Sequence, residues 1–249
     1  VLDTWFSSAL WPFATLNKKD FKTFYPTNSL FTARDIINLW VTRMIFSSQE
    51  FTKKNPFNKV YIHPTVLTKD GQRMSKSLGT GIDPLGLVDQ YGADAVRFGL
   101  AFQIMGGQDV KFSEETILMA KKFCNKLWNA SRFVLQNCSK KQYLVSKVQS
   151  ETTHDKKILK QLEKTKKGIE KDLEYFQFGK AAHKLYKFFW HDFCDVYIEK
   201  SKKKKNEKVL IYVLFNVLKL FHPFIPFITE QIYQKLPIKR KQSLMIEKW

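Results

Sequence analysis

The chain has 249 residues, a length that fits one large domain or two of ordinary size. Hydrophobic residues make up 44% of it, which is enough for a packed core and excludes a wholly disordered chain. Its net charge of +19 is uneven: residues 1–116 carry 13 basic and 11 acidic side chains, whereas residues 117–249 carry 29 and 12. This asymmetry indicates a nucleic acid or an anionic membrane surface as partner, with a merely solvated lysine-rich surface as the alternative.

The cysteines and the most apolar stretch narrow the class further. Cys124, Cys138 and Cys194 form no CxxC pair, so we expect neither a disulfide framework nor a zinc ribbon. We expect the protein to be in a reducing cytoplasmic compartment. The N-terminus shows no signal peptide, and Val1 opens inside an apparently structured segment, so we expect a piece of a longer protein. Residues 209–228 contain two prolines and several polar groups, which predicts a buried helix rather than a membrane span.

The first 112 residues are predicted to be mixed α/β. Apolar residues at helical spacing predict a helix over 35–46. Two short runs rich in β-branched residues, 59–63 and 65–68, predict strands. Asp83 and Pro84 are typical of a helix start, and a further helix is predicted over 93–104.

From Ser113 onward the strand signals stop. Ser113 is a suitable helix cap, and the two glutamates after it oppose the helix dipole favourably. Helical patterns follow at about 154–174, 179–200, 206–221 and 227–236, with Pro226 as an opening residue. The sequence therefore predicts an α/β region followed by an all-α helix bundle.

The segment with the clearest chemistry is 70–79, DGQRMSKSLG. Two cations stand three residues apart, two hydroxyls accompany them, and glycines flank them, which permits close approach to a ligand. Lysine is suited to phosphate and serine adds donors, so such a loop could stabilise charge on a leaving pyrophosphate. The alternative is an ordinary solvated basic turn.

Residues 73–77, RMSKS, resemble the KMSKS signature of class I aminoacyl-tRNA synthetases. Gly79, Ile82, Asp83 and Pro84 also fall where that signature continues. Two positions depart from it: Arg73 replaces the usual lysine, and Thr80 stands where asparagine is usual. Arginine keeps the charge but changes its geometry, so the role of Arg73 is less defined than that of Lys76.

Other segments resemble the valyl-tRNA synthetase subgroup: LDTWFSSALWP at 2–12, QDVKFS at 108–113, FCNKLWNASRF at 123–133, FFWHDFCDVYIE at 188–199 and HPFIPFITE at 222–230. The resemblance covers nearly the whole chain. It implies that 1–112 is the C-terminal part of a Rossmann-like catalytic domain and that 113–249 is a helical-bundle anticodon-binding domain.

The resemblance implies ATP-dependent ligation of valine to its tRNA through valyl-adenylate, with ATP and Mg²⁺ as cofactors. It implies that the catalytic residues are Lys76, Arg73 and Ser75. The same three, together with Met74, Ser77, Asp35 and His63, are expected to bind ATP, although Asp35 is equally suited to cap a helix and His63 to a structural role.

Trp5 and Trp40 are candidates for the apolar wall of the valine pocket, with ordinary core packing as the alternative. In the bundle, Trp190 and Tyr197 are expected to face the core rather than stack on bases. No residue is expected to hold a resident metal.

Class I catalysis also requires a His-Ile-Gly-His-type motif, which the sequence lacks, so we expect this chain alone to be inactive. An editing insertion and a C-terminal coiled coil are likewise expected outside it. The partners expected are valine and its tRNA, with no membrane, and the protein is expected to be a cytoplasmic monomer. The alternatives are an isoleucyl- or leucyl-type synthetase fragment and a non-catalytic, synthetase-derived RNA-binding protein.

Overall fold

The computed structural model describes residues 2–75, 78–139, 141–143, 145, 148–238 and 242–248. The chain divides into two compact units. Unit 1 comprises Val1–Leu67 and Gly107–Val110, and unit 2 comprises Thr68–Gly106 and Lys111–Trp249.

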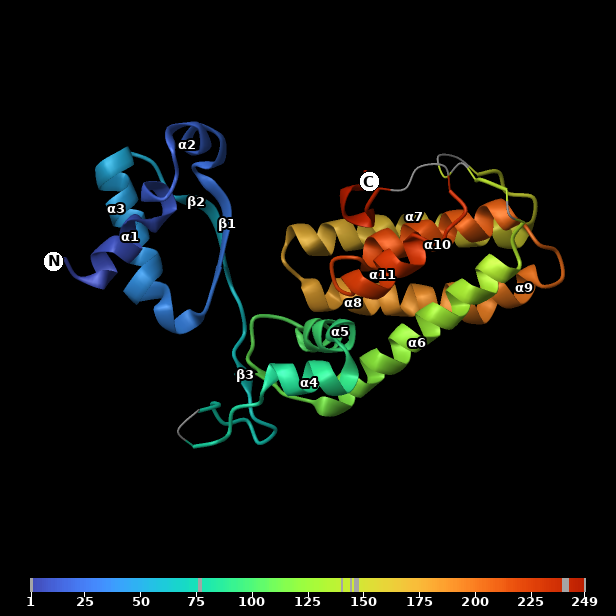
Figure 1. Cartoon of the computed structure of the whole chain (residues 1–249), viewed down its shortest axis with the longest axis horizontal. Coiled ribbons are helices and arrows are strands. Elements are labelled where there is room, and N and C mark those ends of the chain that lie inside the picture. The colour runs from blue at the N-terminus through green and yellow to red at the C-terminus, as the bar shows by residue number, and fades with distance from the viewer. Residues whose placement is uncertain are drawn as a thin grey trace. The chain divides into compact units, whose positions relative to one another are not determined.

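Unit 1 combines helices with short parallel strands (Figure 1). Its elements are α1 (Thr4–Ala14), α2 (Lys18–Phe24), β1 (Thr27–Thr32), the 3₁₀ turn η1 (Arg34–Ile36), the π-helix η2 (Ile37–Val41), α3 (Thr42–Thr52), β2 (Phe57–Ile62) and β3 (Val66–Leu67). Strands β1 and β2 pair in parallel, with Thr27 opposite Phe57 and Thr32 opposite Ile62. A helical connection between neighbouring parallel strands is a βαβ arrangement, so the α/β prediction for this region is confirmed.

The predicted elements of unit 1 are present with shifted ends. The strand expected at 59–63 is β2, and the run 65–68 contains β3, which pairs with β4 (Val110–Lys111). The helix expected over 35–46 is η1, η2 and α3 in succession, with a π-helical stretch that the sequence pattern did not predict. Helices α1 and α2 and strand β1 were also missed.

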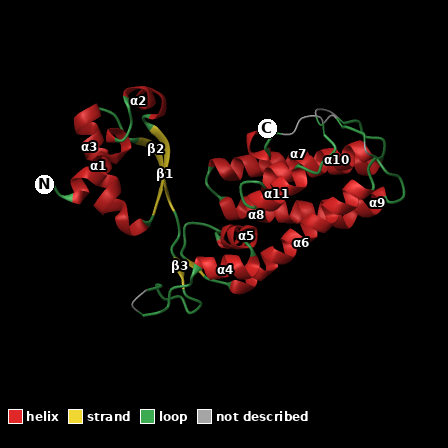
Figure 2. Ribbon diagram, viewed as in Figure 1, coloured by secondary structure: helices red, strands yellow, loops and turns green. Residues whose placement is uncertain are grey.

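Unit 2 is helical from α4 onward (Figure 2). Its helices are α4 (Pro84–Tyr91), α5 (Ala93–Gln103), α6 (Glu114–Gln136), α7 (Thr153–Glu174), α8 (Phe178–Lys187), the π-helix η3 (Phe188–Ile198), α9 (Glu199–Ser201), α10 (Glu207–Phe221), α11 (Pro226–Tyr233) and the 3₁₀ turn η4 (Leu244–Ile246). The all-α prediction is confirmed, because each predicted helix of the second half is found and Pro226 opens α11. The helix expected over 179–200 is α8, η3 and α9 without a break.

One continuous apolar core holds unit 2 together, and it runs from Ala95 on α5 to Leu244 on η4. Helices α5 and α8 approach closely at Gly179, where a Cβ would lie 1.8 Å from the carbonyl oxygen of Ile104. Tyr197 lies in the core as expected, whereas Trp190 is half-buried at its edge.

Polar contacts tie α5 to the end of the bundle. The Asp94 carboxylate accepts hydrogen bonds from the backbone N–H groups of Phe227 and Ile228, at 3.2 and 2.7 Å, and so caps α11. The Arg97 guanidinium donates to the carbonyl oxygens of Pro223 and Phe224. Helix α5 is therefore an integral part of the bundle. Among the described residues, none of the helices has the length and apolar character needed to cross a bilayer.

Candidate functional site

The loop with the synthetase-like signature begins in a tight turn. The N–H of Thr68 donates to the carbonyl oxygen of Gln72 at 2.8 Å, and the Thr68 hydroxyl accepts from the N–H of Gln72 at 3.0 Å. Gly71 has a φ of 87°, a left-handed conformation that glycine adopts without strain. The turn places Arg73, which is exposed, just before the signature's hydroxyl and lysine.

Thr80 closes the loop around the signature. The N–H of Ser75 donates to the Thr80 hydroxyl at 2.9 Å, and the N–H of Thr80 donates to the carbonyl oxygen of Ser75 at 3.2 Å. Lys76 and Ser77 lie between these two points and outside the described residues. Thr80 is one of the two positions where the sequence departs from the signature, and its hydroxyl and backbone N–H together join the two ends of the loop.

Helix α4 anchors the far side of the loop. The Asp83 carboxylate accepts from the N–H groups of Leu85 and Gly86, at 3.0 and 3.2 Å, and Pro84 is the first helical residue. The helix start predicted at Asp83 and Pro84 is thus confirmed. Met74 and Ser75 are half-buried on the near side. The structure therefore brings Arg73, Met74 and Ser75 together on one short loop of unit 2.

In unit 1, Trp5 lines a hollow between α1 and α3. The hollow has a volume of about 470 Å³ and is bounded by Asp3, Trp5, Phe6, Ala9, Arg43, Phe46, Ser47, Glu50 and Phe51. The Arg43 guanidinium lies over the Trp5 ring, 5.1 Å from its centre, which is a cation–π contact. An aromatic floor with one cation and two carboxylates at the rim suits a small ligand that has both an apolar part and charged groups.

Trp40 does not line this hollow. Its indole N–H donates to the carbonyl oxygen of Ser8 at 3.2 Å, and its ring centre lies 6.3 Å from that of Trp11. These contacts join η2 to α1. Such packing is the alternative to a valine contact that the sequence left open for Trp40. The contact of Trp40 with valine stays a prediction.

Asp35 and His63 both lie on exposed parts of unit 1. Asp35 is within η1, whose cap position is Ala33, so the carboxylate is in the first turn rather than at the cap. His63 directly follows β2, where its N–H donates to the carbonyl oxygen of Thr32 and its Nδ1 lies 3.1 Å from the carbonyl oxygen of Pro64. Their contact with nucleotide stays a prediction.

Helix α6 presents a polar face that sequence reasoning did not single out. Residues at helical spacing on this face are exposed: Lys122, Asn125, Asn129, Arg132 and Gln136. Three lysines lie over aromatic rings on or beside α6: Lys126, a residue of α6 itself, over Trp190 at 4.8 Å, Lys202 over Phe133 at 5.7 Å and Lys235 over Trp128 at 5.8 Å.

Amide and guanidinium groups read base edges, and lysines meet phosphates, so this face has the composition of a single-stranded RNA-binding surface. The helical spacing of these residues was visible in the sequence. Their exposure was not, because it depends on which side of α6 the bundle covers.

No resident metal site is evident in the described part of the chain. Nowhere there do three or more His, Cys, Asp or Glu side chains converge as possible ligands. The described residues therefore offer no ready-made ligand set for Mg²⁺.

Residues 1–113 match the family described as tRNA synthetases class I (I, L, M and V), and residues 155–249 match the anticodon-binding domain of tRNA ligases. Over its whole length the chain is 49% identical to a valine--tRNA ligase of Thermotoga maritima and 46% identical to one of Geobacillus stearothermophilus. It spans 30% of the length of each of these relatives.

Solved structures with the same fold are more distant in sequence. The structure of a ternary LeuRS-tRNA-LeuAMS complex of Agrobacterium radiobacter K84 matches 96% of this chain and 32% of its own, with a TM-score of 0.79 and 19% identity. A Mycobacterium tuberculosis methionyl-tRNA synthetase bound by methionyl-adenylate matches 88% of this chain and 46% of its own, with a TM-score of 0.67 and 18% identity. The chain is thus similar to the class I tRNA synthetases over residues 1–113 and to the valine--tRNA ligases throughout its length.

Proposed function

We propose that this chain forms part of a valine--tRNA ligase that joins valine to its tRNA at the expense of ATP. The observation that carries the proposal is sequence identity of 45–49% with valine--tRNA ligases over the whole chain, including the signature loop. A complete enzyme needs a further catalytic motif that these residues do not contain, so the activity is proposed for the full-length protein.

In the first step, a carboxylate oxygen of valine attacks the α-phosphorus of ATP. The bond from that phosphorus to the bridging oxygen breaks, and pyrophosphate leaves with the electron pair. Negative charge grows on the leaving group, so a cation positioned beside it stabilises the transition state more than the ground state.

Lys76 is proposed to supply that cation, with Arg73 and Ser75 as its supporting catalytic groups. The clamp between Ser75 and Thr80 supports this assignment, because it fixes both ends of the segment in whose sequence Lys76 stands. Met74, Ser77, Asp35 and His63 are proposed to complete the ATP-binding set.

Trp5 and Trp40 are proposed to contact the valine side chain. Trp5 is the better supported of the two, because it lines a hollow beside Arg43, whereas Trp40 is engaged in helix packing. An aromatic wall distinguishes valine from isoleucine by overpacking, and one methylene contributes about 1–3 kcal/mol to such discrimination.

In the second step, a hydroxyl of the terminal tRNA ribose attacks the valyl carbonyl carbon, and AMP leaves. The tRNA is proposed to dock on the helical region 113–249, with the polar face of α6 as its main contact. That region holds most of the positive charge, and the match to the synthetase family ends at residue 113 while residues 155–249 match an anticodon-binding domain, which supports a functional boundary near Ser113. The protein is proposed to act as a cytoplasmic monomer.

Valine-dependent exchange of pyrophosphate into ATP by the full-length protein tests the proposal. We expect exchange with valine and much less with isoleucine or leucine. The Lys76→Ala variant should lose exchange about 100- to 1,000-fold, since one such contact contributes about 2.7–4 kcal/mol to the barrier. Lys69→Ala removes the same charge from an exposed position of the preceding turn and should retain activity.

Each alternative predicts a different result. Exchange that depends on isoleucine or leucine would assign the chain to that synthetase instead. Absence of exchange with any amino acid, together with retained tRNA binding, would identify a non-catalytic RNA-binding protein.

A further inference from the structure

Helix α7 carries a row of exposed lysines on its solvent face. Its exposed lysines are Lys156 and, three or four residues apart from one another, Lys157, Lys160, Lys164, Lys167 and Lys171. At this spacing they share one side of the helix. Of the acidic residues of α7, Asp155 and Asp172 are buried and Glu163 pairs with Lys166, whereas Glu170 and Glu174 are exposed, so the six lysines outnumber the exposed carboxylates near them. Within the described residues, none of the six lysines takes part in an ion pair.

The stability of α7 does not explain why so many lysines lie on one side of it. Like charges three or four residues apart destabilise a helix by a few tenths of a kcal/mol per pair. Helix α7 is held instead by its buried side and by a capping box between Thr152 and Asp155. The line of lysines is therefore a surface suited to an anionic partner.

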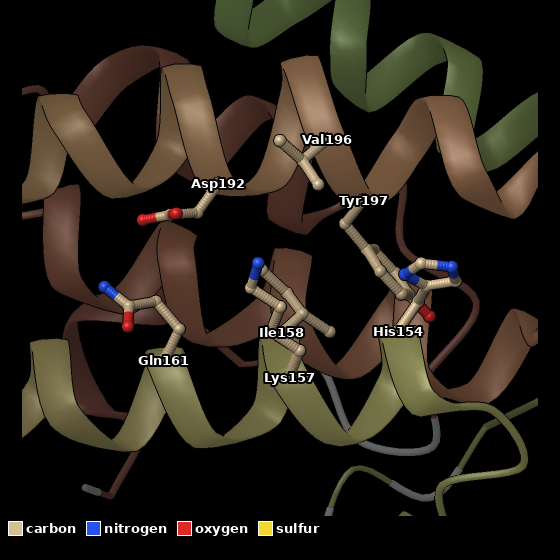
Figure 3. Close-up of a pocket in the computed structure, with 7 residues that line it drawn as sticks. All are labelled: His154, Lys157, Ile158, Gln161, Asp192, Val196 and Tyr197. Carbon is tan, nitrogen blue, oxygen red and sulfur yellow. The ribbon is translucent and has the colours of Figure 1, made fainter.

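A hollow lies at the N-terminal end of this line, between α7 and η3 (Figure 3). Its volume is about 60 Å³, and its apolar floor is formed by Ile158 and the Tyr197 ring, both buried. The Tyr197 hydroxyl donates to Asp155 at 2.7 Å, which fixes the ring in place. The floor is thus rigid and already formed.

Four polar side chains surround the hollow: His154, Lys157, Gln161 and Asp192. Gln161 and Asp192 extend from facing helices, and the Lys157 ammonium points into the gap between them (Figure 3). Within the described residues, none of the four makes a hydrogen bond or an ion pair. A fixed apolar floor with convergent, uncommitted donors and acceptors is typical of a ligand site.

The chemistry of the rim selects the ligand class. A carboxylate accepts hydrogen bonds only, and in nucleic-acid recognition it accepts from an exocyclic amino group such as N4 of cytosine. The Gln161 amide can both donate and accept. Lys157 belongs both to the rim and to the line of lysines. An RNA strand with one base in the hollow could therefore place its phosphates along α7.

We infer that α7 and η3 form a second RNA-binding surface, in which the lysine line holds the phosphate backbone and the hollow takes one unstacked base that carries an amino group. This surface differs from the face of α6, because η3 meets α6 through Trp190 and Asp195 and lines the hollow with Asp192 and Tyr197. The inference rests on the proposed function in that RNA is the partner.

An anionic membrane fits the same charge less well. A helix that binds a bilayer surface inserts an apolar face beside its basic one, whereas the apolar side of α7 is packed in the core. Membrane binding is therefore an outcome of the test below rather than part of the inference.

Binding of fluorescent cytidine and uridine 12-mer RNAs to the 249-residue chain tests the hollow, because cytosine carries the amino group and uracil does not. We expect the cytidine oligomer to bind at least about fivefold more tightly, which corresponds to the lower end of base discrimination by one well-placed contact. Asp192→Asn should erase or reverse this preference. Glu170→Gln makes the same charge change on an exposed part of α7 and should preserve it.

The triple variant Lys160→Gln, Lys164→Gln and Lys167→Gln tests the line of lysines. It should weaken both oligomers alike and lower the slope of log affinity against log salt by about 2, since each phosphate contact to a single strand contributes about 0.7. The control Lys200→Gln, Lys203→Gln and Lys204→Gln removes the same charge and should change the slope less.

Equal affinity for the two oligomers would overturn the base site, and equal effects of the two triple variants would overturn the role of α7. Tighter binding to phosphatidylserine vesicles than to either RNA would overturn the choice of partner. These outcomes are independent of amino-acid activation, so a failure of the proposed enzyme function is recognised separately by pyrophosphate exchange.

Discussion

Units 1 and 2 differ in how much apolar surface they bury. In unit 2, one core joins α5, α6, α7, α8, η3, α10 and α11. In unit 1, the buried cluster consists of Val41, Met44 and Phe57, with two half-buried neighbours. Large apolar side chains of unit 1 are exposed instead, among them Trp11, Phe24, Phe46 and Phe51.

The difference in buried apolar surface indicates that the two units have different roles. Unit 2 buries a large apolar area, which stabilises its fold. It can therefore carry a long charged surface with little loss in the free energy of unfolding. Unit 1 keeps aromatic side chains open around a hollow, which suits contact with small substrates or with further protein, and it contributes less stability. The four predictions below test this comparison.

Gly179→Ala should have the largest effect on stability, and the effect should be confined to unit 2. The added Cβ would lie 1.8 Å from the Ile104 carbonyl oxygen, so α5 and α8 must separate. We expect a loss of about 3 kcal/mol in the free energy of unfolding, at the upper end of overpacking effects. Urea unfolding followed by helical circular dichroism measures it.

Gly168→Ala is the matched control for that variant. Gly168 is also in a helix of unit 2, but its nearest contact would be the Lys184 ammonium at 3.6 Å. Alanine should be neutral there or stabilise by up to about 1 kcal/mol. Equal destabilisation by both variants would show that the α5–α8 approach is not a special constraint.

Asp155→Ala should cost about 2–3 kcal/mol. The buried Asp155 carboxylate accepts from Tyr197, from Asn206 and from two backbone N–H groups, so its removal leaves buried donors unsatisfied. Tyr197→Phe removes only one of these bonds and should cost about 1 kcal/mol. Thermal unfolding of both variants compares them, and a larger loss for Tyr197→Phe would contradict the account.

Glu207→Gln should cost about 1–2 kcal/mol, but only at neutral pH. Hydrogen bonds from Tyr143 and from the Ser139 N–H lower the pKa of the Glu207 carboxyl to about 2. A folded-state pKa below the ordinary value stabilises the protein above about pH 4.5, and that contribution is lost as the pH falls toward 2. Unfolding free energies measured from pH 7 to pH 2 should therefore converge for wild type and variant.

Phe46→Ser should have the smallest effect, within about 0.5 kcal/mol, because the ring is exposed in unit 1. It should nevertheless reduce the binding of a dye that reports on exposed apolar surface. Met44→Ala, two residues earlier on α3 but fully buried, should cost at least about 2 kcal/mol of unit 1's stability. Similar losses for both would mean that unit 1 has a larger core than the comparison assigns to it.

Helices with a clear apolar side and a recognisable cap could be predicted from the sequence. Ser113 accepts a hydrogen bond from the N–H of Thr116, and α6 follows as the pattern indicated. Helices α1 and α2 were missed although Asp3 and Asn17 cap them, because α1 is mostly apolar with a proline inside it and α2 has only seven residues. The π-helical stretches depend on tertiary packing and leave no signal in the spacing of residues.

The candidate sites divide in the same way. The signature loop was found from its order of residues, but the clamp by Thr80 was not, because a threonine at that position departs from the usual pattern. The hollow beneath Asp192 could not be predicted, since it joins residues 38 positions apart, from His154 to Asp192, across two helices. Sequence order locates chemistry within one segment, whereas sites between segments require the packing.

Hydrogen exchange of the 249-residue chain, with and without valine tRNA and at low and high salt, tests the central claim most directly. The account predicts that tRNA slows exchange in unit 2, at α6 and α7 above all, and that high salt removes most of this protection because phosphate contacts release counterions. Protection confined to unit 1, or no protection of α6 and α7 at low salt, would contradict the assignment of the helical region as the tRNA-binding part of the molecule.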